Sequence, residues 1–115
     1  MKHWIGTWLM ATASIHLGSV VFGHSAVFLR VVERGIFNTV EGDPVVGAFV
    51  WSLLFGAVAF IGGLAVSALE RSSGVIPKSL GWSLLALACV GAVLVPVSGF
   101  WLIFPPAIAV LLKRP

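Results

Sequence analysis

The stretch PVVGAFVWSLLFGAVAFIGGLAVSAL, residues 44–69, decides the fold of this chain. It contains no charged residue. Because about 20 apolar residues in a helix suffice to cross the hydrocarbon layer of a bilayer, the stretch predicts a membrane span that can tilt. Small residues recur along it with helical spacing, so we expect a face on which a neighbouring span or a partner chain packs closely. These small residues are Ser52, Gly56, Ala59, Gly63 and Ser67.

Three further apolar stretches accompany this one, at residues 4–22, 80–95 and 100–112. Hydrophilic or turn-forming sequence separates the four stretches from one another. The pattern predicts an all-α fold, an integral membrane four-helix bundle in a single domain that covers residues 1–115. Two alternatives stay open: cleavage of the first stretch as a signal peptide would leave three spans, and the last two stretches could form one bent span.

The composition excludes a water-soluble protein. Hydrophobic residues make up 59% of the chain and charged residues 10%, whereas soluble domains carry about 25% charged residues. The mean hydropathy is +1.09. The net charge of +3 comes from basic residues at the ends of the apolar stretches, so we expect the lipid bilayer as a partner and no nucleic acid. With one cysteine and three dispersed histidines, we predict no metal site and no cofactor.

The distribution of basic residues predicts the topology. Four spans would place one set of basic residues on the side of both termini, Lys2, Arg71, Lys78, Lys113 and Arg114, and a smaller set, Arg30 and Arg34, on the other. Glu70, in a hydrophilic stretch at residues 70–79, is the acidic residue on the first side. The positive-inside rule then predicts a multi-pass protein of the inner membrane with both termini in the cytoplasm.

The connection at residues 25–43 predicts a short interfacial helix between the first two spans. Arg30, Glu33 and Arg34 share one helical face, and apolar residues cover the rest. Ser25 is suited to cap the start of this helix and Gly35 to end it. A further buried segment of the bundle is the alternative reading of the same residues.

His16 and Glu41 are the candidates for acid–base chemistry. His16 shares a face of the first span with Thr12 and Ser19, and a histidine inside a span usually faces the protein interior. It would act either as a hydrogen-bonding group between helices or as a general base. Glu41 would act as general acid or base, or remain a solvated loop residue, whereas Asp43 resembles a helix cap before a proline.

A double proline interrupts the last apolar stretch. Pro105 and Pro106 lack amide hydrogens, so carbonyl groups near Trp101 and Leu102 lose their helical partners. Such groups need a protein partner or a polar cavity at membrane depth. We therefore predict an outer-leaflet cavity with His16 and Glu41 as catalytic candidates. Its predicted ligand-binding residues are Ser19, Trp51, Ser98, Trp101 and Phe104.

Three segments carry a resemblance to a known family: FNTVEGDPVVGAFVW, PKSLGWSLLALA and PVSGFWLIFPPAIAVLL. They resemble a family of short bacterial multi-pass membrane proteins of unknown function, over nearly the whole chain. In size and number of helices the chain also looks like the DoxX-type bundles. The resemblance implies a four-span layout and brings no activity with it.

These features predict a small membrane protein that binds an apolar or lipid-like ligand, or docks on a membrane partner protein or a second copy of itself. One alternative is a membrane enzyme of the isomerase or cyclase type, in which His16 or Glu41 moves protons on an apolar substrate. A second is an oligomeric small transporter, although the spans lack the charges typical of ion coupling. The sequence does not decide whether the protein is an enzyme.

Overall fold

The computed structural model describes residues 3–96 and 99–112. This part of the chain is all-α, as the hydropathy pattern predicts. The predicted residue Ser98 and the flanking residues Lys2, Lys113 and Arg114 lie outside it. The helices are α1 (Ile5–Gly23), α2 (Ser25–Glu33), α3 (Pro44–Ser72), α4 (Lys78–Leu94), the 3-10 helix η1 (Gly99–Ile103) and α5 (Phe104–Leu112).

Two of the described helices are long and apolar enough to cross a membrane. They are α1, with 19 residues, and α3, with 29 residues. The two later stretches form shorter apolar helices, because α4 has 17 residues and the prolines restrict α5 to 9 residues after η1. All four predicted stretches are therefore helical, and two of them meet the length of a span.

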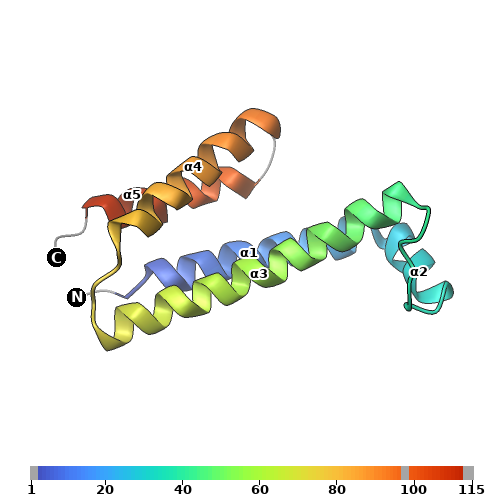
Figure 1. Cartoon of the computed structure of the whole chain (residues 1–115), viewed down its shortest axis with the longest axis horizontal. Helices are drawn as coiled ribbons and strands as arrows, with labels where there is room; N and C mark the ends of the chain where they lie inside the picture. Colours follow the sequence, from blue (N-terminus) through green and yellow to red (C-terminus); the bar gives the residue numbers. More distant parts are fainter. Residues whose placement is uncertain (1–2, 97–98, 113–115) are drawn as a thin grey trace.

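The helices form two antiparallel pairs (Figure 1). One pair is α1 with α3, and the other is α4 with η1 and α5. The second pair rests on the first through contacts of η1 and α5 with α1. Among the described helices, the backbones of α3 and α4 do not approach each other closely, so α1 is the element that joins the two pairs.

Small residues bring α1 and α3 together. A Cβ atom added at Gly56 would lie 2.5 Å from the Leu17 side chain, and one at Gly63 would lie 2.7 Å from Met10. A Cβ atom at Gly6 would collide with the backbone of Ser67. The small-residue face of α3 is thus a packing surface for a neighbouring helix of the same chain, as its spacing predicts.

One end of the molecule gathers four segments around a shared core. Ile5 at the start of α1, Val66 near the end of α3, Ile76 in the next connection and Val110 in α5 form one buried cluster. We call this end the basal end and the opposite end, where α2 lies, the α2 end (Figure 1). The start of α1 and the end of α5 therefore lie on the same side of the molecule.

The structure corrects the placement of Glu70. Its side chain does not belong to a hydrophilic connection but is 1% exposed at the basal end. Its carboxylate oxygens accept hydrogen bonds from the backbone amides of Ile5, at 3.2 Å, and Gly6, at 2.7 Å. The start of α1 needs such an acceptor because Trp4, which precedes it, provides no side-chain cap. A negative charge also complements the dipole at a helix start.

Lys78 has the matching position at the end of α5. Its Nζ atom donates to the carbonyl oxygens of Val110, at 3.0 Å, and Leu111, at 2.7 Å. These carbonyls lie in the last turn of α5, where a helix leaves acceptors unpaired. The basal end therefore carries an acid on a helix start and a base on a helix end.

The connection between α1 and α3 contains the expected short helix. Helix α2 ends before Gly35, whose φ of +85° suits a glycine at this position. Ser25 is the first helical residue and not the cap, because His24 occupies the capping position. Since α2 has no buried residue, the reading of this connection as a buried segment is wrong.

Candidate functional site

His16 links α1 to α3. Its Nε2 atom lies 3.0 Å from the carbonyl oxygen of Ser52, and because a carbonyl only accepts, the imidazole donates through Nε2. The ring also meets Phe55 edge-on, with centroids 5.7 Å apart and planes at 84°. These contacts are those of a hydrogen-bonding group between helices. A role of His16 in proton transfer stays a prediction.

Two phenylalanines that the sequence reading missed continue this contact toward η1. The ring of Phe55 lies 6.1 Å from that of Phe100. Phe100 in turn packs so closely on α4 that a Cβ atom at Gly91 would collide with its ring. The pair Gly91 and Phe100 is the sequence signal for this contact, because a large ring on one helix needs a small residue on its neighbour.

The proline break leaves a backbone carbonyl without its helical donor, and a side chain of another helix supplies the missing hydrogen bond. Pro106 cannot donate to the carbonyl of Leu102, four residues earlier. The indole Nε1 of Trp8 donates to that carbonyl instead, at 2.6 Å. The freed carbonyl of Leu102, predicted from the sequence, is therefore satisfied by α1, and this bond fastens η1 to the first pair of helices.

The other predicted site residues are dispersed. Trp101 packs on Phe104 with ring centroids 5.5 Å apart and donates from Nε1 to the carbonyl of Pro96 at 2.8 Å. Ser19 donates to the carbonyl of His16 at 2.8 Å. Trp51 is 71% exposed on α3.

Glu41 lies in the exposed connection before α3. One of its carboxylate oxygens accepts a hydrogen bond from the Asn38 side-chain amide at 2.7 Å. This is the environment of a solvated loop carboxylate. A catalytic role of Glu41 stays a prediction.

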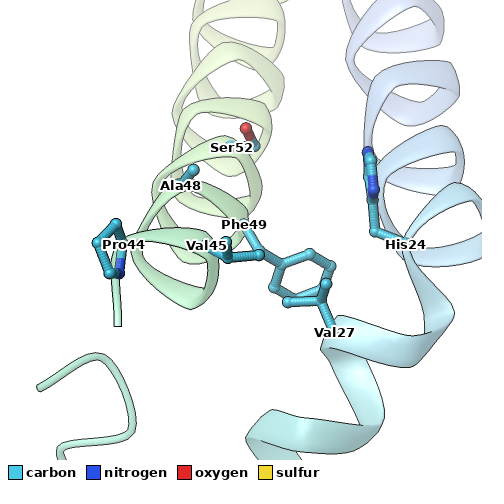
Figure 2. Close-up of a pocket in the computed structure, with 7 residues that line it drawn as sticks. All are labelled: His24, Val27, Pro44, Val45, Ala48, Phe49 and Ser52. Carbon is cyan, nitrogen blue, oxygen red and sulfur yellow. The ribbon is translucent and has the colours of Figure 1, made fainter. Parts of the chain in front are cut away.

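A groove of about 360 Å³ opens at the α2 end, between the end of α1 and the start of α3. Figure 2 shows His24 on one wall, facing Ala48 and Ser52 on α3, with Phe49 and Val27 between the two walls. The lining is mostly apolar and includes none of the residues predicted for the cavity. It consists of His24, Val27, Pro44, Val45, Ala48, Phe49 and Ser52.

The bend between α1 and α2 places His24 on this groove. The backbone amide of His24 donates to the carbonyl of Val20 in the last turn of α1. The backbone carbonyl of His24 accepts from the amides of Val27 and Phe28, at 3.0 Å each, in the first turn of α2. Phe28 packs edge-on against Phe49 of α3, with centroids 6.2 Å apart. The turn of the chain and this aromatic contact together close one side of the groove.

Asp43 fastens α2 to the start of α3. One carboxylate oxygen accepts from the amides of Val45 and Val46, which confirms the predicted helix cap. The other oxygen lies 2.8 Å from Arg34 and 3.5 Å from Arg30. The hydrogen bond from the Val46 amide, followed by the contacts with the two guanidinium groups, holds the pKa of Asp43 below its usual value, against the opposing effect of desolvation.

The described residues thus define a helical protein with two helices that could cross a bilayer and an apolar groove at one end. A family described as a family of unknown function (DUF6463) matches residues 1–115, and the chain belongs to this family. The resemblance to an uncharacterised family is therefore confirmed. No curated protein and no solved structure matches the chain.

Proposed function

We propose that the protein is a multi-pass protein of the inner membrane, that both termini lie in the cytoplasm, and that it binds a lipid-like ligand in the groove at the α2 end. In this proposal α1, α3, α4 and the η1–α5 segment are the four spans. The groove is the observation that carries the binding function.

The distribution of side-chain sizes supports a lipid environment. Small residues such as Gly56 and Gly63 are buried between helices, whereas Phe22 is 83% exposed and Trp51 is 71% exposed. Soluble proteins bury their large apolar side chains. Helices in lipid instead pack through small residues, because lipid chains already surround the large ones favourably.

The dimensions and charges support the proposed topology. At 1.5 Å per residue α1 is about 28 Å long and α3 about 43 Å long, against roughly 30 Å of hydrocarbon. The start of α1 and the end of α5 share the core of the basal end. Arg71 and Lys78 lie near this end, which favours its placement on the cytoplasmic side.

Shape and lining support a lipid-like ligand. Ligand sites in proteins are concave, mostly apolar and roughly 300–1,000 Å³ in volume, with a few polar groups that orient the ligand. The groove combines apolar walls on α2 and α3 with the imidazole of His24 and the hydroxyl-bearing residue Ser52. The contacts of His16 and Glu41 favour binding over acid–base catalysis. An enzyme, an oligomeric transporter and a membrane partner stay predictions without support of their own.

Cysteine labelling tests the topology. The single cysteine Cys89 is first replaced by serine, and Asn38→Cys or Ser73→Cys is then introduced in the connections before and after α3. In intact spheroplasts a membrane-impermeant maleimide is expected to label Asn38→Cys and to label Ser73→Cys only after permeabilisation. Labelling of both positions without permeabilisation contradicts the proposal.

Mass spectrometry of extracted lipids tests ligand binding. Ala48→Phe places a ring in the groove, and Ala65→Phe adds the same ring at an exposed position of α3 outside it. We expect a lipid-like molecule to co-purify with the wild-type protein and with Ala65→Phe, and to be depleted in Ala48→Phe. Equal amounts in all three proteins contradict the proposed function.

A further inference from the structure

The groove at the α2 end is lined by two side chains with unused hydrogen-bonding groups. They are His24, at the bend between α1 and α2, and Ser52 on α3. Ser14 and Ser83, elsewhere in the helices, donate to the carbonyl oxygen four residues earlier, at 2.9 Å and 2.8 Å. Within the described residues, the Ser52 hydroxyl and the His24 ring form no hydrogen bond. Both groups therefore remain open to a ligand.

The two side chains lie on opposite walls of the groove, below its rim. Figure 2 shows the imidazole of His24 turned back along α1, opposite Ala48 and Ser52. The carbonyl oxygen of Ser52 contacts His16, seven residues before Gly23, so Ser52 lies about 10 Å from the end of α1. Because α1 is about as long as the hydrocarbon layer is thick, this level falls within the layer if α1 spans it. A ligand that reaches Ser52 then has its polar atom below the headgroups.

The charges around the groove favour an uncharged ligand. Three carboxylates at the α2 end, those of Glu33, Glu41 and Asp43, are set against the two guanidinium groups of Arg30 and Arg34, so positive charge is not in excess. The residues that line the groove include no arginine, lysine or carboxylate. A charged group at hydrocarbon depth without such a partner is costly.

The two open groups are suited to a ligand oxygen that only accepts. A serine hydroxyl donates one hydrogen and can rotate toward its acceptor, and a neutral imidazole donates through one ring nitrogen. The hydrocarbon layer contains no water that could donate, so the carbonyl oxygen of an apolar molecule is left unpaired there. In the groove, its two lone pairs can accept from His24 and Ser52 together. Donors on the protein therefore distinguish such a molecule from the surrounding lipid chains.

We propose that the groove binds an uncharged, apolar ketone, whose carbonyl oxygen accepts hydrogen bonds from His24 and Ser52 while its hydrocarbon chain lies against Val27, Val45 and Phe49. This inference rests on the proposed function and specifies its ligand. The volume of about 360 Å³ is near the lower limit for ligand sites, which suits an unbranched molecule.

Binding of dioctyl ketone, which carries its carbonyl at the centre of an unbranched chain, tests this inference. The full chain is reconstituted in phosphatidylcholine nanodiscs, and the dissociation constant is measured by native mass spectrometry. His24→Leu and Ser52→Ala are each expected to weaken binding about fivefold, as for the loss of one hydrogen bond. The matched controls His3→Leu, before the start of α1, and Ser83→Ala, on α4, are expected to change it less than about twofold.

An infrared spectrum reports on the hydrogen bonds themselves. A heavy carbon isotope at the ketone carbonyl separates its band from those of lipid and protein. We expect this band at lower frequency with the wild-type protein than in nanodiscs without protein, because a hydrogen bond weakens the carbonyl bond. The variant that combines His24→Leu with Ser52→Ala is expected to lose this shift.

The outcomes separate this inference from the proposed function, with the alkane heptadecane as a competitor. If heptadecane displaces the ketone at equal concentration and neither His24→Leu nor Ser52→Ala weakens binding, while Ala48→Phe blocks it, the groove binds apolar chains without selecting a carbonyl and the inference is overturned. If the ketone does not bind although Ala48→Phe depletes a co-purified lipid, the inference alone fails. If Ala48→Phe changes neither, the proposed function fails with it. Circular dichroism of each variant establishes that the helices are retained.

Discussion

At the scale of single residues, Glu70 shows how a charged group can serve an apolar fold. The start of α1 has no side-chain cap of its own, and the carboxylate of Glu70 takes that place. Both of its oxygens accept hydrogen bonds from backbone amides of α1. The sequence reading missed it because a glutamate at the end of an apolar stretch looks like a membrane flank. Only the antiparallel packing of α1 on α3 brings it to the amides of Ile5 and Gly6.

We expect Glu70→Ala to lower the free energy of unfolding by about 1–3 kcal/mol, because two backbone amides at a buried helix start lose their acceptor. Glu70→Gln is expected to lower it less, since the amide oxygen can still accept one of the two bonds. Thermal unfolding in detergent, followed by circular dichroism, measures both. The control Glu33→Ala removes an exposed glutamate at the end of α2 and is expected to change the stability by less than about 0.5 kcal/mol.

Trp8 provides a second test at this scale. Trp8→Phe keeps an aromatic ring and removes the donor to the carbonyl of Leu102, so we expect a loss of about 1 kcal/mol of stability. Trp82→Phe, which alters an exposed tryptophan of α4, serves as the control. An equal effect of the two substitutions in the same unfolding assay would mean that the bond of Trp8 is not what fastens η1 to α1.

Asp43 predicts a pH dependence. A carboxyl group whose pKa is lowered in the folded state stabilises the protein above its usual pKa, 3.8, and this contribution is lost as the pH falls through the folded pKa. Asp43→Asn keeps a capping side chain but loses the ion pairs with Arg34 and Arg30. We therefore expect the wild-type protein to unfold at a higher temperature than the variant near pH 6, and the difference to shrink as the pH falls below 3.8 and to disappear once the pH is below the lowered pKa of the folded state. A difference that persists at lower pH contradicts this assignment.

At the scale of helices, hydropathy and turn residues predicted the positions of all four apolar elements and of α2. These signals are local, since an apolar run or a Pro or Gly residue affects the backbone at its own position in the sequence. The choice of which face of a helix packs against which other helix depends instead on residues that are distant in sequence. Trp51 directly precedes Ser52, whose carbonyl oxygen His16 contacts, so its side chain leaves α3 about 100° around the helix from that of Ser52, and it is 71% exposed. The role of Trp51 in ligand binding stays a prediction.

The same limit explains why the candidate site was predicted only in part. The contact of His16 with another helix and the need of Leu102 for a partner follow from the chemistry of those groups, and both were anticipated. The groove instead depends on the angle at which the chain turns at His24. The turn is accompanied by the packing of Phe28 on Phe49, a contact between two different helices that no local pattern encodes.

Two neighbouring glycines of α3 test the packing of this helix against α1. Gly63→Ala is expected to destabilise the protein by about 1–3 kcal/mol, because the new Cβ atom would lie 2.7 Å from Met10 and 2.9 Å from its backbone nitrogen. Gly62→Ala meets nothing within 4 Å and gains helix propensity, so we expect it to stabilise by about 0.5–1 kcal/mol. Opposite signs in one unfolding assay support the close approach of the two helices, and equal signs contradict it.

At the scale of the whole molecule, the chain is an elongated body of 50 × 30 × 20 Å in which α1 holds two helical pairs together. Large apolar side chains cover its outside, and small residues fill its helix contacts. Two polar side chains at the basal end form hydrogen bonds between segments that are distant in sequence. Glu70 accepts from the start of α1, and Lys78 donates to the end of α5. The α2 end is held instead by Asp43 and by the contact of Phe28 with Phe49.

The position of Glu70 sets an order for assembly at the ribosome. The acceptor for the first helix is synthesised 65 residues after the Ile5 amide that it serves. At translation rates of about 5–20 residues per second, the leading helix waits roughly 3–13 s for its cap. During that interval its opening amides must bind water or lipid headgroups. The first helix therefore acquires its final anchorage only when the third has been made.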